Sequence, residues 1–442
     1  MAEIVPFRGL RYNPEKVPDL AEVVIPPYDV ISPAEQDRFY QIHPHNMIRL
    51  ELGKKTPQDT EEDNPHTRAG NTLDRWLSES ILVREPKPAI YYYELDFTLG
   101  EGVRRTRFGF ISTMRLAEFT TGMVKPHEKT FQAVKNERLR LMLSCRANLS
   151  PVFVLYSDPS RAVDRCLRQG KEGEPTLSFA DAWGMRHRIW ALTGPRVLKE
   201  VRELMGDKAI FIADGHHRYE TALKYRDIQR ERFASARPDA PYEHILIYLA
   251  NLNQEGMIIL PTHRMLRHLG AWEPESFLQK ASEFFEVARF PSGPEGERQW
   301  RTALESARAA KENAIGLFRQ GDDAFYLLKA REEAVSRHLE GKGIARVLHR
   351  LDVVVLDQVI LRHLMGLDEG FLADENNIHF KHELSEGLDG VRAQVYEAGF
   401  FINPTRIEQV QEAANSGLIM PHKSTYFYPK VGSGLVIHTL WP

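Results

Sequence analysis

The sequence predicts an α+β fold with more than one compact unit. Short apolar runs alternate with helix-like segments through the middle of the chain, as expected for a sheet with helices packed against it. A glycine-containing turn near residue 100 separates two further apolar runs, which indicates an antiparallel hairpin. The 442 residues also exceed what one hydrophobic core usually serves, so we expect two or three domains.

The first predicted elements are an extended segment and a helix near residue 30. Residues 23–30 contain two adjacent prolines, which exclude a regular helix there. Ser32 then offers a side-chain oxygen as N-cap, and Pro33 suits the first helical turn. A helix is therefore expected to begin shortly after Tyr28 and Asp29.

The hairpin consists of residues 90–98 and 103–111, joined through the turn at 100–102. Its second strand carries Arg104, Arg105 and Arg107. Charged side chains protect an edge strand from pairing with other chains. We therefore expect these three arginines to lie on a solvated edge of the sheet.

The middle and the C-terminal part of the chain contain the remaining predicted elements. The strands are expected at 151–156, 186–192, 244–250, 285–287, 314–318, 324–328, 378–380 and 400–402, and the helices at 160–168, 195–205, 219–233 and 403–415. The predicted domains are a core of residues 1–270, a small α+β module of residues 271–342, and a C-terminal α+β segment of residues 343–442 that closes the core.

Composition excludes several classes of protein. The formal net charge of -3 argues against a protein that holds DNA through an overall basic surface. Two cysteines do not make a disulfide framework, and no Cys-x-x-Cys pair indicates zinc. Neither a signal peptide nor an apolar stretch of membrane-spanning length is recognisable, so we expect a cytoplasmic protein without membrane partners.

The most informative segment is Phe211–Leu223, where an apolar run meets a polar turn and continues as a helix-like segment. The turn reads Asp214-Gly215-His216-His217-Arg218. The first N–H groups of a helix lack backbone partners and carry partial positive charge, so this turn suits an anion, above all phosphate. Asp214 could hold a metal or accept a hydroxyl proton. The alternative is a helix cap with surface histidines.

The same turn carries a family resemblance, because Asp-Gly-His-His-Arg-Tyr-Glu-Thr-Ala is similar to the hallmark of the domain of unknown function 1015 family. Further segments that resemble this family are Val5–Tyr12, Pro26–Ser32, His127–Thr130, Asn136–Leu139, Leu260–Arg264 and Met420–Lys430. They extend over nearly the whole chain. The family name itself implies no activity.

The turn also resembles the phosphate-binding turn of the ParB and sulfiredoxin superfamily, which implies a ParB/sulfiredoxin-like core sheet. Sulfiredoxins carry a catalytic cysteine where this chain has His216, so reduction of sulfinic acids is not expected. Partition proteins of the superfamily bind CTP and add a helix-turn-helix domain. The Asp-Gly-His turn is more similar to that of the free serine kinases.

The resemblance implies roles for residues of the N-terminal half. The position of Asp29 resembles the substrate-side loop of the ParB-like fold, so Asp29 could contact a hydroxyl substrate or a metal, or merely stabilise a turn. His127, Glu128 and Lys129 are consecutive and cannot share one face of a helix or strand, which favours a loop. There Glu128 is a candidate base or metal ligand, and His127 and Lys129 are candidate phosphate contacts.

Two further segments are candidates for the same pocket. His263 and Arg264 lie at a predicted strand end, where open sheets bind ligands, or form a core histidine with a surface arginine. Lys423, Ser424 and Thr425 offer an ammonium and two hydroxyl groups to a phosphate. The alternative for this segment is an aromatic-rich strand that packs in the core.

Together these residues predict a phosphotransferase that uses ATP or ADP and Mg²⁺ to phosphorylate a small hydroxyl compound, with free serine among the candidates. His216, His217 and Arg218 would hold the phosphates, and Asp214 would hold Mg²⁺. The alternatives are a non-catalytic regulatory protein that binds CTP or ATP, and a hydrolase of nucleotides or phosphoesters. The expected partners are a nucleotide and a small hydroxyl substrate rather than nucleic acid, and self-association is left open.

Overall fold

The computed structural model describes residues 2–128, 130–233, 238–270, 272–421 and 423–441 of the chain. It is a mixed α/β protein with two compact units. Unit 1 comprises Met1–Pro126, Thr130–Ile258 and Pro429–Pro442, and unit 2 comprises His127–Lys129 and Ile259–Tyr428. These units divide the chain differently from the predicted boundaries at 270 and 342, because strands from both sides of residue 342 share one sheet.

Unit 1 is built on a nine-stranded mixed sheet in the order β6-β11-β8-β12-β5-β4-β10-β9, with β1 paired to β5. The strands are β1 (Ile4–Val5), β4 (Ile90–Leu99), β5 (Val103–Arg115), β6 (Val124–Lys125), β8 (Val152–Tyr156), β9 (Leu177–Ala180), β10 (Arg186–Leu192), β11 (Ile210–Asp214) and β12 (His244–Asn251). Smaller pairs join β2 (Leu10–Tyr12) to β3 (Leu82–Arg84) and β7 (Ala147–Asn148) to β21 (His438–Thr439). The predicted antiparallel hairpin is confirmed as β4 and β5.

The prediction for the hairpin arginines is wrong for Arg107. β5 pairs with β12 as well as with β4, so much of it lies inside the sheet. The Arg107 side chain is fully buried, and its guanidinium lies 4.8 Å from the ring centre of Phe153 and 5.3 Å from that of Tyr248. Its Nη1 donates a hydrogen bond to the carbonyl oxygen of Pro429. Long-range packing, which no local pattern encodes, therefore outweighs the preference of arginine for solvent.

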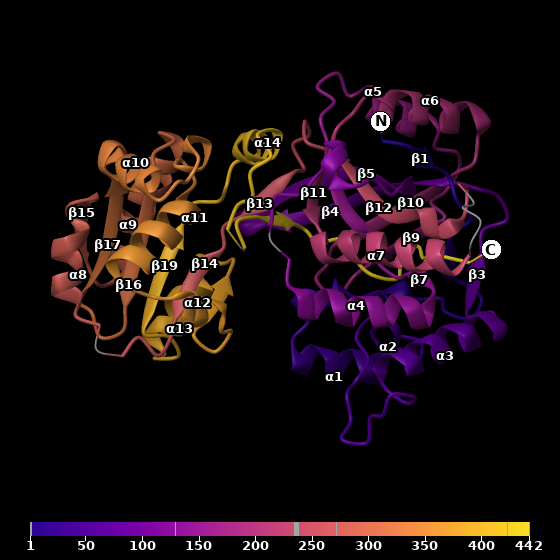
Figure 1. Cartoon of the computed structure of the whole chain (residues 1–442), viewed down its shortest axis with the longest axis horizontal. Coiled ribbons are helices and arrows are strands. Elements are labelled where there is room, and N and C mark those ends of the chain that lie inside the picture. The colour runs from indigo at the N-terminus through magenta and orange to yellow at the C-terminus, as the bar shows by residue number, and fades with distance from the viewer. Residues whose placement is uncertain (1, 129, 234–237, 271, 422, 442) are drawn as a thin grey trace. The chain divides into compact units, whose positions relative to one another are not determined.

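Helices cover both faces of this sheet (Figure 1). The helices of unit 1 are α1 (Pro33–Ile42), α2 (Ile48–Glu51), α3 (Pro65–Ser78), α4 (Gln132–Cys145), α5 (Ala162–Gln169), α6 (Pro195–Met205) and α7 (His216–Arg232). On one side α7, α4 and α3 follow one another in successive layers, and α5 and α6 lie on the other side. The predicted Ser32 cap is confirmed, since its side chain accepts from the backbone N–H of Glu35.

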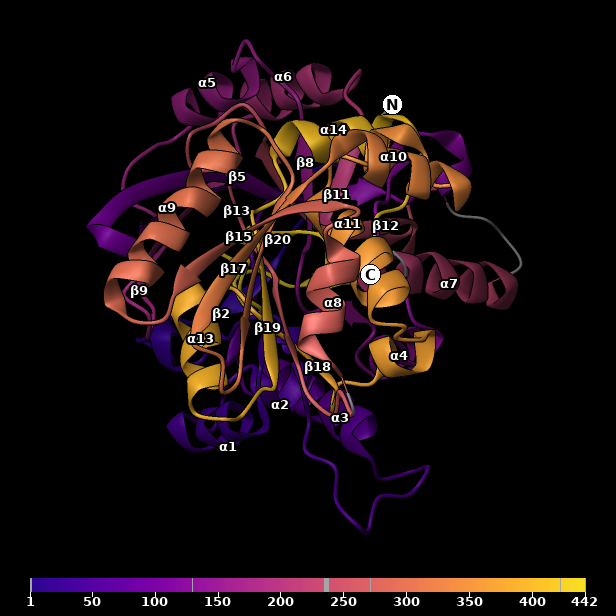
Figure 2. The same ribbon diagram turned by 90° about the vertical axis from the view of Figure 1, so that its left-hand side faces the viewer.

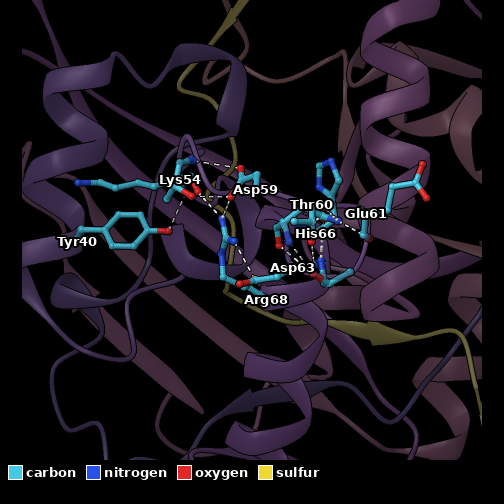
Figure 3. Close-up of polar contacts among 11 residues, drawn as sticks. Tyr40, Lys54, Asp59, Thr60, Glu61, Asp63, His66 and Arg68 are labelled. Carbon is cyan, nitrogen blue, oxygen red and sulfur yellow. Dashed lines mark hydrogen bonds and ion pairs between the residues drawn. The ribbon is translucent and has the colours of Figure 1, made fainter.

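A charged loop between α2 and α3 is fastened by one arginine (Figure 3). The Arg68 guanidinium donates to Asp59 at 2.9 Å, to Asp63 at 2.9 Å and to the carbonyl oxygen of Lys54 at 2.9 Å. Asn64 caps α3 by accepting from the backbone N–H groups of the first turn. The loop thereby fixes the start of α3, which packs against α4.

Unit 2 has a six-stranded sheet in the order β15-β17-β16-β19-β14-β18. Its strands are β14 (His263–Leu266), β15 (Phe285–Pro291), β16 (Ala314–Arg319), β17 (Ala324–Ala330), β18 (Ile378–Lys381) and β19 (Ala398–Ile402), and β13 (Ile258–Leu260) pairs separately with β20 (Tyr426–Tyr428). Every pairing of the six-stranded sheet is antiparallel. β19 thus joins the predicted middle module to the predicted C-terminal segment.

The helices of unit 2 also lie on both faces of its sheet, as Figure 2 shows. They are α8 (Pro274–Ala281), α9 (Pro294–Ala309), α10 (Glu332–Gly341), α11 (Asp352–Val355), a π-helical continuation of α11 (Leu356–Leu364), α12 (Glu369–Ala373), α13 (Leu384–Arg392) and α14 (Ile407–Asn415). Trp300 of α9 and Leu388 of α13 enter the same core. The last helix begins at Ile407 rather than at the predicted Asn403.

Among the described residues, no helix combines the length and the apolar character that crossing a membrane requires.

Candidate functional site

The Asp-Gly-His-His-Arg turn joins β11 to α7, as the sequence predicts. Asp214 is the last residue of β11 and His216 is the first residue of α7. Gly215 between them has a φ of 91°, a left-handed conformation that strains any other residue. A Cβ atom there would lie 2.9 Å from Nε of Arg218. Glycine is therefore needed both for the backbone and for the arginine that folds back over it.

Two cations converge on Asp214, and we call Asp214, Arg218 and Lys430 the Asp214 cluster. Nη2 of Arg218 donates to Oδ2 of Asp214 at 2.6 Å, and Nζ of Lys430 forms an ion pair with Oδ1. Nη1 of Arg218 donates to the carbonyl oxygen of Pro151 at 2.5 Å. The three side chains are only 10–11% exposed. Each carboxylate oxygen of Asp214 thus already has a cationic partner.

A second buried ion pair lies close to Arg218. Nη1 of Arg138 on α4 lies 3.3 Å from Oε1 of Glu51, and both side chains are at most 5% exposed. The Ser150 hydroxyl donates to the same oxygen at 3.3 Å. Burial raises the pKa of Glu51, while the charges of Arg138 and Arg218 act against this shift. Together with Arg218, these residues line a cavity of about 40 Å³.

Tyr28 connects the N-terminal segment to this ion pair. The Arg138 guanidinium lies 4.0 Å from the centre of the Tyr28 ring, a cation–π geometry. Burial and the neighbouring Asp29 carboxylate raise the pKa of the Tyr28 hydroxyl, and the charges of Arg138 and Arg218 lower it. Asp29 follows in a short 3₁₀ turn and its side chain is exposed.

The two histidines of the turn have different surroundings. His216 is buried at 4% exposure. Nε2 of the half-buried His217 accepts a hydrogen bond of 2.9 Å from the backbone N–H of Phe131. Glu220, one turn further along α7, accepts from Thr130 at 2.9 Å and from Lys135 at 2.7 Å. The first turns of α7 therefore hold the segment that leads into α4.

A second set of the predicted residues gathers in unit 2. Nε2 of the buried His127 lies 3.0 Å from Oγ1 of Thr425. The His127 carbonyl oxygen accepts from the backbone N–H of Met420 at 2.8 Å, and Glu128 forms a backbone bridge with the same residue. The Ser424 hydroxyl donates to the carbonyl oxygen of Pro421 at 2.5 Å. Predicted site residues from two distant segments thus lie side by side.

The pair His263-Arg264 belongs to this set, which we call the His127 cluster. Arg264, at 4% exposure, donates to the carbonyl oxygen of Lys423 at 3.1 Å. Burial lowers the pKa of its guanidinium to about 10. Nδ1 of His263 accepts from the backbone N–H of Ile402 at 3.2 Å, and burial lowers the pKa of the ring to about 3. The imidazole of His263 is therefore neutral and acts as a hydrogen-bond acceptor.

The predicted site residues accordingly divide between the two units. Asp29, Asp214, Gly215, His216, His217 and Arg218 belong to unit 1, and His127, Glu128, His263, Arg264, Lys423, Ser424 and Thr425 belong to unit 2. Lys129 lies outside the described residues. The sequence did not single out Glu51, Arg138 or Lys430. Lys430 and Arg138 stand in segments that resemble the family, whereas no local pattern marks Glu51.

No group of three or more His, Cys, Asp or Glu side chains within the described part of the chain is placed to hold a metal ion.

Comparison with known proteins identifies the family. The sequence profile described as "Protein of unknown function (DUF1015)" matches residues 4–354. The chain belongs to this family. Family membership explains why segments that resemble DUF1015 occur from the N-terminus to beyond the middle of the chain. No curated protein matches the sequence.

Several solved structures resemble this DUF1015 protein distantly. A free serine kinase variant in complex with AMP is 10% identical, with a TM-score of 0.33 over 69% of this chain and 84% of that chain. A conserved hypothetical protein from Pyrococcus furiosus is 11% identical, with a TM-score of 0.32 over 70% and 90%. SbnI with a C-terminal truncation, from Staphylococcus aureus, is 9% identical, with a TM-score of 0.29 over 72% and 84%.

Proposed function

We propose that the Asp214 cluster binds the phosphates of a nucleotide and that the protein transfers a phosphoryl group to a small hydroxyl compound. One observation carries the proposal: two buried cations and the start of a 17-residue helix converge on a single carboxylate at a glycine turn. Positive charge concentrated at a helix N-terminus stabilises an anion. A phosphate group would compete with Asp214 for these cations.

The phosphate would be held by groups of different kinds. The first N–H groups of α7 lack backbone partners within the helix and can donate to phosphate oxygens. The Lys430 ammonium lies on a flexible side chain and could turn from Asp214 to the phosphate. Arg218 also fastens Pro151 and Asp214, so it would act chiefly by holding the turn and its charge in place.

Asp214 does not fit the role of a protein ligand for Mg²⁺ in this arrangement. Both of its oxygens are in ion pairs, and a metal ion would have to displace a buried cation. We therefore derive no step through Mg²⁺ held by Asp214. A magnesium ion that arrives with the nucleotide phosphates is compatible with the proposal.

The acceptor hydroxyl needs a group that takes its proton, or a phosphoryl donor reactive enough to make the base unnecessary. Asp29, which lies in the same unit as the Asp214 cluster, is the proposed carboxylate for this role. The motif resemblance makes free serine the first acceptor to test. The ParB/sulfiredoxin-like core and the choice between ATP and ADP belong to the same proposal.

The test uses Asp214→Asn in the full-length protein. Since Asp214 neutralises Lys430 and Arg218, its removal should raise affinity for ATP or ADP by about tenfold, which corresponds to about 1.4 kcal/mol. The same change should lower turnover, because Asp214 holds Arg218 and Lys430 in place at the turn. Affinity is measured by isothermal titration with ATP, ADP, CTP and GTP, each with Mg²⁺. Glu220→Gln, which removes an ion-paired carboxylate elsewhere on α7, is the matched control.

Product analysis separates the three functions. A kinase forms a phosphorylated acceptor only when the acceptor is present. A hydrolase releases phosphate without it, and a regulatory protein binds nucleotide but changes neither compound. If no nucleotide bound the native protein, the kinase and regulatory readings would both be overturned.

A further inference from the structure

An arginine-lined hollow of about 950 Å³ lies in unit 1 at the hairpin end of β4 and β5. Six arginines line it: Arg104, Arg105, Arg161, Arg168, Arg186 and Arg188. They come from β5, from β10, and from α5 with the residue before it. None of them belongs to the Asp214 cluster or the His127 cluster. A volume of this order matches that of small-molecule sites in proteins.

The register of the sheet places several of these side chains on one face. In β10, Arg186 and Arg188 lie opposite Asp96 and Glu94 of β4. In β5, Thr106 also lies opposite Asp96, and Arg104 lies opposite Thr98. Residues directly opposite each other, and those two positions further along, share a face. Arg104, Arg186 and Arg188 therefore share one face of the sheet, with β4 between Arg104 and the other two.

The charges in the hollow are only partly balanced. Arg188 lies 2.9 Å from Asp96 and 3.2 Å from Glu94, and Arg161 lies 3.1 Å from Asp164. Asp96 and Glu255 line the hollow beside the six arginines. Glu94 is also shared with Lys171 at 2.9 Å. The hollow therefore carries an excess of positive charge.

Protection of an exposed strand edge does not explain this charge. Beyond its pairing with β12, the backbone of β5 is already occupied by Gln254. The Gln254 side chain accepts from the N–H of Phe108 at 2.8 Å and donates to its carbonyl oxygen at 2.9 Å. Gly256 lies so close that an added Cβ would be 2.1 Å from the carbonyl oxygen of Thr106. At Thr106 and Phe108 the edge is therefore covered without the arginines.

We propose that this hollow is a second binding site, for a small organic compound that carries two or three linked phosphate groups. Guanidinium groups match phosphate oxygens in geometry and keep their charge at any physiological pH. Six arginines around one hollow, against the lining acids Asp96 and Glu255, suit a ligand with several negative charges.

The surroundings favour recognition of phosphate over recognition of a base or a polymer. Arg168 covers the Phe108 ring, with its guanidinium 4.1 Å from the ring centre, and Phe97 is buried. Neither ring offers a free face for stacking a base. The net charge of -3 opposes non-specific attraction of nucleic acid. The hollow therefore selects a ligand by its number of phosphates.

The experiment titrates the full-length protein with tripolyphosphate, pyrophosphate and inorganic phosphate by calorimetry. Affinity should rise in the order phosphate, pyrophosphate, tripolyphosphate. The exposed pair Arg104→Ala with Arg186→Ala should weaken tripolyphosphate binding at this site by at least about tenfold, because two charged hydrogen-bonding groups are removed. Arg202→Ala, an exposed arginine of α6 outside the hollow, is the matched control and should bind like the parent protein.

A Lys430→Met variant separates this site from the Asp214 cluster. It should keep the binding that the double variant loses, even if it no longer binds nucleotide at the turn. Tripolyphosphate binding that is equal in the double variant and the parent would overturn the proposal, as would an absence of binding to the parent. Neither result would decide whether the Asp214 cluster binds nucleotide, which rests on Asp214→Asn.

Discussion

The Asp214 cluster and the His127 cluster contain the same kinds of residue but use them differently. In unit 1, Arg218 and Lys430 balance the carboxylate of Asp214, and Arg138 balances Glu51 nearby. In unit 2, Arg264 donates to a backbone carbonyl group and also feels the charges of Asp357 and Glu128, and His263 is a neutral acceptor for a backbone N–H. In the Asp214 cluster, a ligand could replace the carboxylate as the partner of the two cations. The His127 cluster fastens loops and strand ends to one another.

This difference teaches that a motif of histidine, arginine and lysine does not by itself identify an anion site. What matters is which groups hold each cation, since Arg218 donates both to the Asp214 carboxylate and to the Pro151 carbonyl oxygen. A carboxylate can be displaced by a phosphate without leaving the fold incomplete. A carbonyl oxygen that loses its donor in a buried place destabilises the fold.

The largest expected effect is a loss of stability when a buried carboxylate of unit 1 is left without its cationic partner. Arg138→Met removes one partner of the buried Glu51–Arg138 pair and leaves Glu51 with the Ser150 hydroxyl and the more distant Arg218. A buried charge without its partner destabilises a protein by about 3–5 kcal/mol. We expect a loss of about 3 kcal/mol in the free energy of unfolding, measured by urea denaturation.

The double variant Glu51→Leu with Arg138→Met tests whether the unpaired charge is the cause. It should recover much of the loss, because neither charge of the buried Glu51–Arg138 pair then remains. If the single variant were destabilised by less than about 1 kcal/mol, the description of unit 1 as a set of mutually balanced charges would be wrong.

Gly215→Ala should have the next largest effect, since it disturbs the turn that brings Arg218 to Asp214. The left-handed backbone and the contact with the Arg218 guanidinium both oppose an added methyl group. Together they should destabilise the protein by about 2 kcal/mol, measured as above. Gly122→Ala is the matched control, because Gly122 has a φ of 69° but open space around it, and it should cost about 1 kcal/mol. Equal losses would show that the arginine contact contributes nothing.

The sequence could predict the features that depend on local signals, but not the partners that are distant in the chain. The bounds of β10 and α6 agree with the prediction, because an apolar run and a proline at the first helical turn are local signals. The turn before α7 was predictable for the same reason. Lys430, however, is 216 residues away from Asp214 in the chain, and Arg138 is 87 residues away from Glu51. Partners at such separations are determined by the packing of the whole unit.

Burial was predicted least well for charged residues. Arg107 has the sequence surroundings of an exposed strand residue, yet Phe153, Tyr248 and Pro429 surround it. The predicted site residues also could not be assigned to separate clusters, since residues 127–129 belong to unit 2 although the residues on both sides belong to unit 1. Local patterns indicate which residues bear chemistry, and the tertiary structure decides which of them meet.

The smallest expected effect is a pH dependence that belongs to the His127 cluster. Burial lowers the pKa of His263 to about 3, whereas an unfolded histidine titrates near 6.5. The unfolded chain therefore binds the proton first as the pH falls, so the stability that neutral His263 provides is complete above about pH 6.5 and declines toward pH 3. Between pH 7 and 5.5 the free energy of unfolding of unit 2 should fall by about 1 kcal/mol on this account.

His263→Asn should remove that part of the pH dependence while keeping an acceptor for the N–H of Ile402. The readout is urea unfolding of the full-length protein, followed by hydrogen exchange in peptides that cover β14 and β19, which reports on unit 2. The exposed His268 of unit 2 provides the control, and His268→Asn should leave the dependence unchanged. An equally steep dependence in His263→Asn would mean that the pKa of this ring is about the same in the folded and the unfolded protein. The His127 cluster would then gain a cation near pH 6.5, and its contrast with the Asp214 cluster would disappear.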